Sequence, residues 1–271
     1  MRKFKIRHIL SLSGGKDSAA LAIYMRDRVP DMEYIFHDTD KELPETYEYL
    51  NRLEAILGKK VTRTTAEQSF DKWLAVYGGM IPSPQKRWCT KMLKIKPFEQ
   101  YVGGDLVINY VGLRADEHRE GYISSKPNIK AVHPFWDDGL EYSDIIRILE
   151  ESGLGLPKYT EWGRSRSGCF FCFFQKKIEW VRLKERYPDL FEKAKEYEYA
   201  NKKNGNPFYW NREEPLEELE KPERMERIKQ KWAEDRLRAR KKPENKTLVH
   251  ILGGGLEDDE EEREGCLICS L

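Results

Sequence analysis

The sequence predicts an α/β fold, in which a parallel sheet with helices on both faces is followed by a helical C-terminal region. Two observations lead to this prediction. Short apolar runs alternate with segments of helical pattern over residues 1–150, and a glycine-rich turn joins the first run to the first helical segment. Such alternation is typical of parallel sheets, whose ligands bind at the carboxyl ends of the strands. The 271 residues suffice for one large domain or two small ones.

The expected strands are short apolar runs. They cover residues 8–12, 33–37, 61–64 and 106–111, and the last reads as the clearest buried strand. Helices are expected between and after them, at residues 19–25, 44–56, 88–101 and 142–152. Pro44 suits the first turn of its helix, whereas Pro97 predicts an interruption in the helix that contains it.

The character of the chain changes after about residue 160, where charged helical segments replace the alternation. Residues 179–202 and 216–241 are expected to be helical, and the second segment has a sparse apolar stripe of Leu219, Met225, Ile228, Trp232 and Leu237. Two interpretations of this segment stay open. The stripe packs a solvated helix against the protein, or the basic residues Arg236, Arg238, Arg240, Lys241 and Lys242 contact a nucleic acid backbone.

Charge and hydropathy limit the possible classes of protein. The formal net charge is only +1 although 35% of the residues are charged, so any basic surface must be local. No apolar run approaches the roughly 20 residues of a membrane span. The basic N-terminus lacks the apolar core of a signal peptide. We therefore expect a cytoplasmic protein without a membrane anchor.

Five cysteines are present, and structural disulfides are rare in the cytoplasm. Two pairs, Cys169/Cys172 and Cys266/Cys269, have two intervening residues, whereas Cys89 stands alone. Spaced pairs suit a metal, an iron–sulfur cluster or redox chemistry. The second pair follows three glycines and an acidic run, so it is expected to lie beyond a hinge.

The segment from Ser13 to Ser18, Ser-Gly-Gly-Lys-Asp-Ser, lies between an expected strand and an expected helix. Glycines let the backbone approach an anion, and a helix N-terminus offers N–H groups and partial positive charge. The spacing differs from a Walker A loop, which has four residues between its first glycine and the Gly-Lys pair. The setting favours a phosphate cradle over an ordinary glycine turn with a surface lysine.

This hexapeptide resembles the pyrophosphate loop (PP-loop) of the N-type ATP pyrophosphatases, which cleave ATP between the α and β phosphates. Other segments resemble the phosphoadenosine-phosphosulfate reductase family within that class, in the family's order. They are residues 38–47 (Asp-Thr-Asp…Leu-Pro-Glu-Thr-Tyr), 87–97 (Arg-Trp-Cys-Thr-Lys…Lys…Pro), 112–119 (Gly-Leu-Arg-Ala-Asp-Glu…Arg), 133–136 (His-Pro-Phe-Trp) and 168–172 (Gly-Cys-Phe-Phe-Cys). The resemblance covers residues 8 to 175 and implies a Rossmann-like fold of the adenine nucleotide alpha hydrolase type. It divides the chain into a PP-loop domain, 1–175, and a charge-rich region, 176–271.

The chain departs from the reductases within this resemblance. Asp40 stands where reductases have glycine, Cys89 has no adjacent cysteine, and the reductase's C-terminal Cys-Gly-His signature is absent. The pattern is more similar to the ATP pyrophosphatases of bacterial DNA phosphorothioation systems (DndC and SspD type). That similarity implies cleavage of ATP to AMP and pyrophosphate, which activates a DNA backbone phosphate for sulfur insertion. It also implies that a cysteine desulfurase and other modification proteins are partners, and it leaves a homo-oligomer open.

Three other functions remain as alternatives: a sulfonucleotide reductase, a transfer-RNA thiolation enzyme and a non-catalytic accessory subunit. For the favoured one, the resemblance implies that Lys16, Asp17 and Arg114 are catalytic. ATP and Mg²⁺ would be bound by these three together with Ser13, Gly14, Gly15, Ser18, Asp38, Thr39, Gly112 and Arg119. The alternative for the two arginines is a surface ion pair with Asp116, Glu117 or Glu120. Lys91 and Lys94, three residues apart on a helix, would bind substrate or pyrophosphate, or face solvent.

The resemblance also places Cys89, Cys169 and Cys172 at one pocket. Three thiolates can hold a [4Fe–4S] cluster with one open position, which Cys266 or Cys269 would fill. Zn²⁺ is the competing interpretation because four thiolates also suit a tetrahedral ion. A sulfur relay through the tail cysteines is a third possibility.

Overall fold

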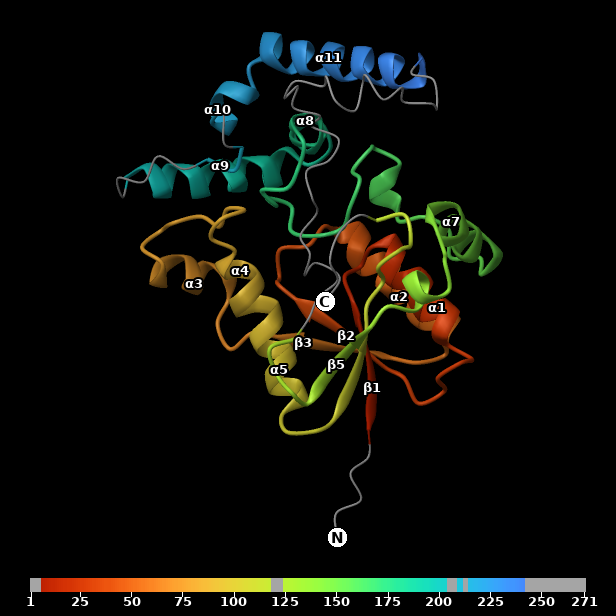
Figure 1. Cartoon of the computed structure of the whole chain (residues 1–271). Coiled ribbons are helices and arrows are strands. Elements are labelled where there is room, and N and C mark those ends of the chain that lie inside the picture. Colours follow the sequence, from red (N-terminus) through yellow and green to blue (C-terminus); the bar gives the residue numbers. More distant parts are fainter. Residues whose placement is uncertain (1–5, 118–123, 204–208, 212–213, 242–271) are drawn as a thin grey trace, which may run out of the picture.

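The computed structural model describes residues 6–117, 124–203, 209–211 and 214–241. Its centre is a sheet of five parallel strands in the order β3-β2-β1-β4-β5 (Figure 1). The strands are β1 (Arg7–Leu12), β2 (Glu33–Asp38), β3 (Val61–Thr65), β4 (Val107–Tyr110) and β5 (Ile129–Val132). The predicted parallel α/β fold is therefore confirmed. The sequence did not reveal β5, which has only four residues, one of them a lysine.

Helices connect the strands and continue beyond them. They are α1 (Lys16–Met25), α2 (Pro44–Leu57), α3 (Phe70–Val76), α4 (Trp88–Thr90), α5 (Lys96–Val102), α6 (Pro134–Asp137), α7 (Tyr142–Glu151), α8 (Lys177–Arg186), α9 (Pro188–Lys203), α10 (Leu216–Leu219) and α11 (Pro222–Lys241). None of the helices in the described part of the chain is long and apolar enough to cross a membrane.

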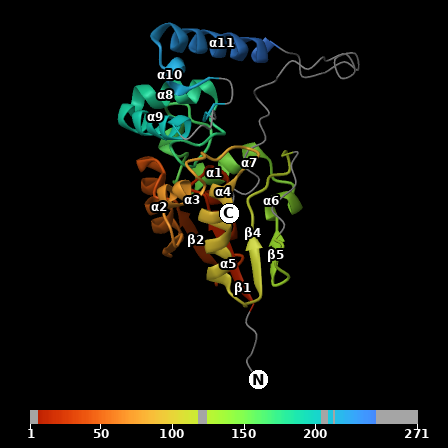
Figure 2. The same ribbon diagram turned by 90° about the vertical axis from the view of Figure 1, so that its left-hand side faces the viewer.

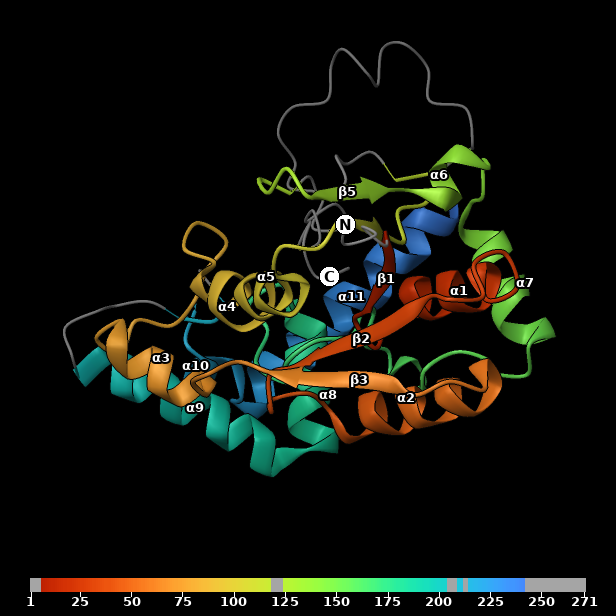
Figure 3. The ribbon, with the colours of Figure 1, turned by 90° about the horizontal axis from the view of Figure 1, so that it is seen from below.

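Both faces of the sheet are covered, as the alternation along β1 requires. Leu10 and Leu12 point into a hydrophobic cluster with residues of α1, α2 and α7, whereas Ile9 points into a second cluster with residues of α5. Figure 3 shows α5 on one side of the strands and α1, α2 and α7 on the other. Since successive side chains of a strand point to opposite faces, this division confirms the predicted helices on both faces.

The predicted helix over residues 88–101 is interrupted before Pro97, which stands in the first turn of α5. The break is a π-helical turn from Lys91 to Ile95. Lys91 is exposed, whereas Lys94 is half-buried. The changed helical period explains why the two lysines, three residues apart, are not equally presented to solvent.

The C-terminal helices lie beyond the carboxyl ends of the strands (Figure 2). Each of the two long helices expected there is split by a proline, one at Pro188 and the other at Pro222. Proline lacks the N–H that a helix interior needs and is accepted in a first turn, so α9 and α11 begin at these residues. The sequence pattern had missed both breaks.

The predicted apolar stripe is largely correct. Leu219 and Ile228 are buried, and Met225 and Trp232 pack against the same cluster. Leu237 was wrongly included, because 57% of it is exposed. This cluster also contains Trp88 and Phe171, so one hydrophobic core crosses position 175, where the sequence was divided.

Candidate active site

The glycine-rich turn lies at the carboxyl end of β1, and residues 111–114 follow the adjacent strand β4. The chain leaves β1 toward β2 on one side and reaches β4 on the other. This reversal of strand order is the point at which open α/β sheets bind their ligands. The fold thus brings Gly112 and Arg114 to the turn from nearly 100 residues away.

Hydroxyl groups hold the turn in shape. The Ser13 N–H donates to Ser18 Oγ at 3.1 Å, and Ser18 Oγ donates to the Gly15 carbonyl, also at 3.1 Å. Ser13 Oγ accepts from the Gly15 N–H at 3.3 Å. The two serines therefore fix the backbone that would face a phosphate.

Close packing explains why three positions of the site hold glycine and not a larger residue. Gly14 has φ +71°, and a Cβ there would lie 2.3 Å from Thr46 Cγ2. A Cβ on Gly15 would lie 2.9 Å from Ser167 Oγ, and one on Gly112 would lie 3.2 Å from the Asp17 carbonyl oxygen. Larger residues would push these segments apart. Thr46 and Ser167 were not predicted as site residues, although both lie within or beside the quoted motifs.

Lys16, Asp17 and Arg114 form one charge cluster beside the turn. Lys16 Nζ lies 3.2 Å from Asp17 Oδ2, and Arg114 Nη1 lies 2.8 Å from Asp17 Oδ1. Burial alone would raise the pKa of Asp17, but the charges of Lys16 and Arg114 outweigh it and lower that pKa. Asp17 therefore stays ionised and holds both cations beside the turn.

Arg114 also makes the ion pairs that the sequence offered as its alternative role. Its Nε donates to Asp116 Oδ1 at 2.8 Å, and its Nη1 lies 3.7 Å from Glu117 Oε1. Burial works against its charge, but Asp17 and Asp116 outweigh that effect, so the pKa of Arg114 is raised. The guanidinium remains cationic at any working pH.

Tyr142, the first residue of α7, adds an aromatic ring that the sequence analysis overlooked. Lys16 Nζ and Arg114 Cζ each lie 5.5 Å from the centre of this ring. Cations at this distance from a tyrosine ring are attracted by its quadrupole. The ring is 47% exposed, so it lies at the mouth of the charge cluster.

Asp38 is the last residue of β2 and Thr39 follows it, at the predicted strand end. Their contacts lead to residues 168–172, which we call the cysteine turn. Asp38 Oδ1 accepts from the Tyr47 hydroxyl at 2.7 Å, whereas Thr39 Oγ1 lies 3.3 Å from Cys169 Sγ. The Phe170 N–H donates to the Lys41 carbonyl at 2.8 Å. The 38–47 and 168–172 segments are thereby joined edge to edge.

Asp40 has a left-handed backbone with φ +60°, unlike any other non-glycine residue in the described ranges. Glycine adopts this conformation without the Cβ penalty. We expect Asp40→Gly to raise the free energy of unfolding by about 0.5–1 kcal/mol in a urea titration. Asp137→Gly, within the helical backbone of α6, serves as control and should lower it. A loss of stability in Asp40→Gly would show that the Asp40 side chain outweighs the strain.

The three predicted cysteine ligands are half-buried and pack against the hydrophobic cluster that contains Trp88 and Phe171. Cys169 and Cys172 form a turn in which the Cys172 N–H donates to the Cys169 carbonyl at 3.0 Å. Burial and the nearby carboxyl of Glu42 raise the pKa of the Cys169 thiol. In the described ranges no three Cys, His, Asp or Glu side chains converge as metal ligands do. The described thiols alone therefore do not form a site for a cluster or Zn²⁺.

Five residues singled out in the sequence, Arg119, Glu120, Lys242, Cys266 and Cys269, lie outside the described residues. Glu42, which was not predicted, is buried beside Thr39 and Cys169, and its Oε2 has no hydrogen-bond partner among the described residues. Burial raises the pKa of this carboxyl, although the positive charge of Lys94 opposes the shift. The charge of Lys94 thus favours the ionised forms of both Glu42 and Cys169.

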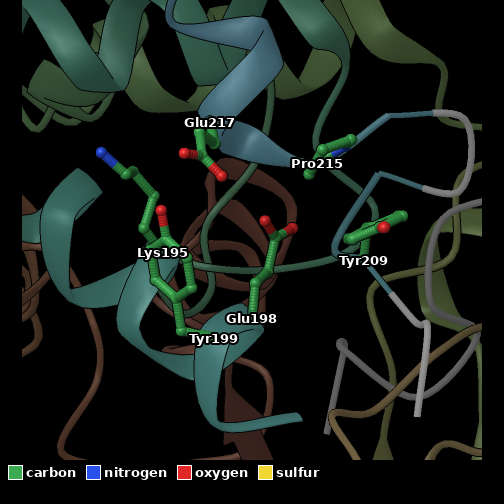
Figure 4. Close-up of a pocket in the computed structure, with 6 residues that line it drawn as sticks. All are labelled: Lys195, Glu198, Tyr199, Tyr209, Pro215 and Glu217. Carbon is green, nitrogen blue, oxygen red and sulfur yellow. The ribbon is translucent and has the colours of Figure 1, made fainter. Parts of the chain in front are cut away.

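A pocket lies away from this site, between α9 and the segment that leads into α10 (Figure 4). Its lining includes Glu198, which accepts from the backbone N–H groups of Trp210 at 2.9 Å and Leu216 at 2.8 Å. Burial raises the pKa of Glu198 to about 7 despite these bonds. The carboxyl joins α9 to the start of α10, so we assign it a structural role.

Parts of this chain are similar to known proteins. Over 218 residues the chain is 31% identical to an uncharacterised protein of Methanocaldococcus jannaschii, a match that covers 74% of this chain and 44% of that protein. It is also 31% identical over 133 residues to an adenosine 5'-phosphosulfate reductase of Staphylococcus haemolyticus, covering 46% and 53% of the two chains. The chain spans less than half the length of the first relative.

A solved phosphoadenylyl-sulfate reductase from Candida auris, in complex with phosphate, is similar with a TM-score of 0.48 and 14% identity, covering 60% of this chain and 81% of that one. The model of the phosphoadenosine phosphosulfate reductase domain matches residues 7–148, which is just over half of the chain. That range begins at β1 and includes the glycine turn, Arg114 and the start of α7. The chain belongs to the phosphoadenosine phosphosulfate reductase domain family.

Proposed function

We propose that this protein is an ATP pyrophosphatase, which cleaves ATP to AMP and pyrophosphate and so activates a DNA backbone phosphate for sulfur insertion. The main support is the placement of Lys16 and Arg114, both held by Asp17, beside a glycine turn at the switch point of the sheet. Two cations and a strand-to-helix turn suit a triphosphate better than an uncharged ligand.

The proposed reaction assigns each group a task. Lys16 and Arg114 neutralise the charge that accumulates on the leaving pyrophosphate. Asp17 holds both cations in place before the nucleotide binds, and the turn lets backbone N–H groups approach the phosphates. Mg²⁺ usually binds through one or two carboxylates and the substrate phosphates. Asp17 fits that role, and the ion would supply further charge neutralisation.

The deciding experiment is to incubate the purified protein with ATP and Mg²⁺ and to separate the products. Equal amounts of AMP and pyrophosphate are expected, whereas ADP with phosphate would contradict the proposal. For sulfur insertion, the protein would be co-expressed with a cysteine desulfurase, and digested DNA would be analysed for phosphorothioate linkages. Transfer-RNA nucleosides from the same cells, analysed for sulfur, test the RNA alternative.

A sulfonucleotide reductase is the second candidate, because one similar protein is an adenosine 5'-phosphosulfate reductase. Asp40 and the single Cys89 argue against it, since both depart from the reductase pattern. Sulfite released from either sulfonucleotide, without pyrophosphate from ATP, would favour this candidate. The [4Fe–4S] cluster, its Zn²⁺ alternative and the role of Cys266 and Cys269 stay predictions, and no step of the reaction is derived through them.

Tyr142 should affect this reaction through Lys16 and Arg114, whose cations both contact its ring. We expect Tyr142→Ala to lower kcat/KM for pyrophosphate release about tenfold, because two cation–π contacts of about 0.5–1 kcal/mol each are lost. Tyr142→Phe keeps the ring and should stay within about twofold of wild type. Trp136→Ala is the matched control, since Trp136 is equally exposed at 47% and belongs to the neighbouring helix α6. Equal losses in Tyr142→Ala and Tyr142→Phe would contradict this role.

A further inference from the structure

Two arginines share one tryptophan ring where α8 meets α11. Arg182 Cζ lies 4.2 Å from the centre of the Trp232 ring, and Arg236 Cζ lies 4.9 Å from it. Arg182 comes from α8, whereas Trp232 and Arg236 lie one turn apart on α11. Figure 1 shows α8 beneath α11, beyond the carboxyl ends of the strands. We call these three residues the arginine–tryptophan stack.

The charges of Glu179 and Glu185 favour protonated Arg182, but no carboxylate of the described residues is bonded to the stack. The Arg182 guanidinium donates to the Gly163 carbonyl at 2.8 Å. Glu179 and Glu185, the two nearby acids, bond to other groups. Glu179 accepts from the Ser165 N–H at 2.6 Å, and Glu185 pairs with Lys229.

The like charges act on each other. Burial is the main cause that lowers the pKa of Arg182, the charge of Glu179 opposes this shift, and the charge of Arg236 adds to it. An anion beside the two guanidinium groups would relieve this repulsion. Guanidinium groups suit phosphate in particular, because their N–H groups match its oxygens in pairs.

A short segment connects the stack to the glycine turn. Arg182 lies against Gly163, where a Cβ would come within 2.2 Å of its Nη1, and Ser167 lies against Gly15. Ser167 is four positions after Gly163, so an extended chain between them spans at most about 14 Å. With the side chains at each end, the stack and the turn are therefore at most on the order of 25 Å apart. One nucleic acid strand covers this distance with fewer than about ten phosphates.

We propose that the arginine–tryptophan stack binds the phosphate backbone of the nucleic acid strand that enters the active site. This inference rests on the proposed function for its substrate class and extends that function to a second contact. The stack supplies affinity and register, and the reaction occurs at the glycine turn.

The test measures binding of fluorescent oligonucleotides of about 20 nucleotides by anisotropy, over a range of salt concentrations. Probes of single-stranded DNA, duplex DNA and RNA with the same sequence show which kind of nucleic acid the stack binds. Arg236→Ala should weaken binding about five- to tenfold and reduce the salt slope by about one. Arg238→Ala is the control, because Arg238 is two residues away and faces Glu234 at 4.0 Å and Asp235 at 3.9 Å. It should stay within about twofold of wild type.

Equal effects of Arg236→Ala and Arg238→Ala would overturn the proposal, and so would wild-type protein that binds none of the three probes. Pyrophosphate release from ATP in the absence of nucleic acid should be unchanged in Arg236→Ala. If the wild type releases no pyrophosphate but binds DNA through Arg236, the stack is supported and the proposed reaction is not. The binding role of the stack and the proposed reaction can therefore be refuted independently.

Discussion

Lys16→Ala is expected to reduce pyrophosphate release by about 10²- to 10³-fold, the loss that follows when one charge-stabilising group is removed from an active site. The Lys16 side chain is 18% exposed and lies outside the hydrophobic clusters, so its removal should leave the fold intact. Stopped assays of pyrophosphate with ATP as substrate measure the first effect, and urea unfolding measures the second.

Lys60→Ala is the matched control for this prediction. Lys60 also pairs with an acid, Glu54, at 3.0 Å, but its side chain is 92% exposed and it stands next to β3. Its loss should change neither activity nor stability measurably. Activity of Lys16→Ala within about twofold of wild type would refute the phosphate-binding role of the glycine turn.

The residues around Lys16 illustrate what the sequence could predict. The turn and its flanking elements are local features, because a strand, two glycines and a helix occupy one stretch of about 20 residues. Strand ends in a parallel sheet share one edge, so a common site for the turn and Asp38 also followed from the pattern. Gly112 and Arg114 were assigned to that site by the family resemblance.

Other features depend on contacts that no local pattern encodes. β5 is short and partly polar, and α3 lies between two turns, so neither has a clear periodicity. Ser167 touches Gly15, and Tyr142 touches Lys16, through tertiary packing of distant segments. Leu237 has the spacing of its stripe but extends past the core, which ends near Trp232. The apolar period identifies which side of α11 faces the protein. It does not show where along the helix the hydrophobic core ends, and only the structure does.

Arg164 is the clearest example of a residue that the sequence did not single out, since arginine is seldom fully buried. It is only 1% exposed. Its Nη2 donates to the carbonyls of Gly168 at 3.0 Å and Cys169 at 2.8 Å. Its Nε donates to the Arg166 carbonyl at 3.0 Å, and its Nη1 donates to Gln175 Oε1 at 3.1 Å. One guanidinium group thus holds both sides of the cysteine turn.

Removing this group should produce the largest loss of stability of any substitution considered for this chain. Arg164→Ala removes four hydrogen bonds and leaves the acceptors on Arg166, Gly168 and Gln175 without this donor. The Cys169 carbonyl keeps the Cys172 N–H as a donor. Each buried acceptor left unpaired costs about 1–3 kcal/mol. Because the turn can relax, we expect a total loss of about 3–5 kcal/mol in the free energy of unfolding, measured by urea titration. Arg164→Lys keeps the charge but not the planar fork, so it should recover only part of that loss.

The control for Arg164 is Arg166→Ala. Arg166 is half-buried and contributes its backbone carbonyl to the network, which the substitution preserves. We expect this variant to lie within about 0.5 kcal/mol of wild type. A loss below about 1 kcal/mol in Arg164→Ala would mean that the turn is held by its phenylalanines instead. If the guanidinium does hold it, Arg164→Ala should also make Cys169 and Cys172 react faster with a thiol reagent, whereas Arg166→Ala should not.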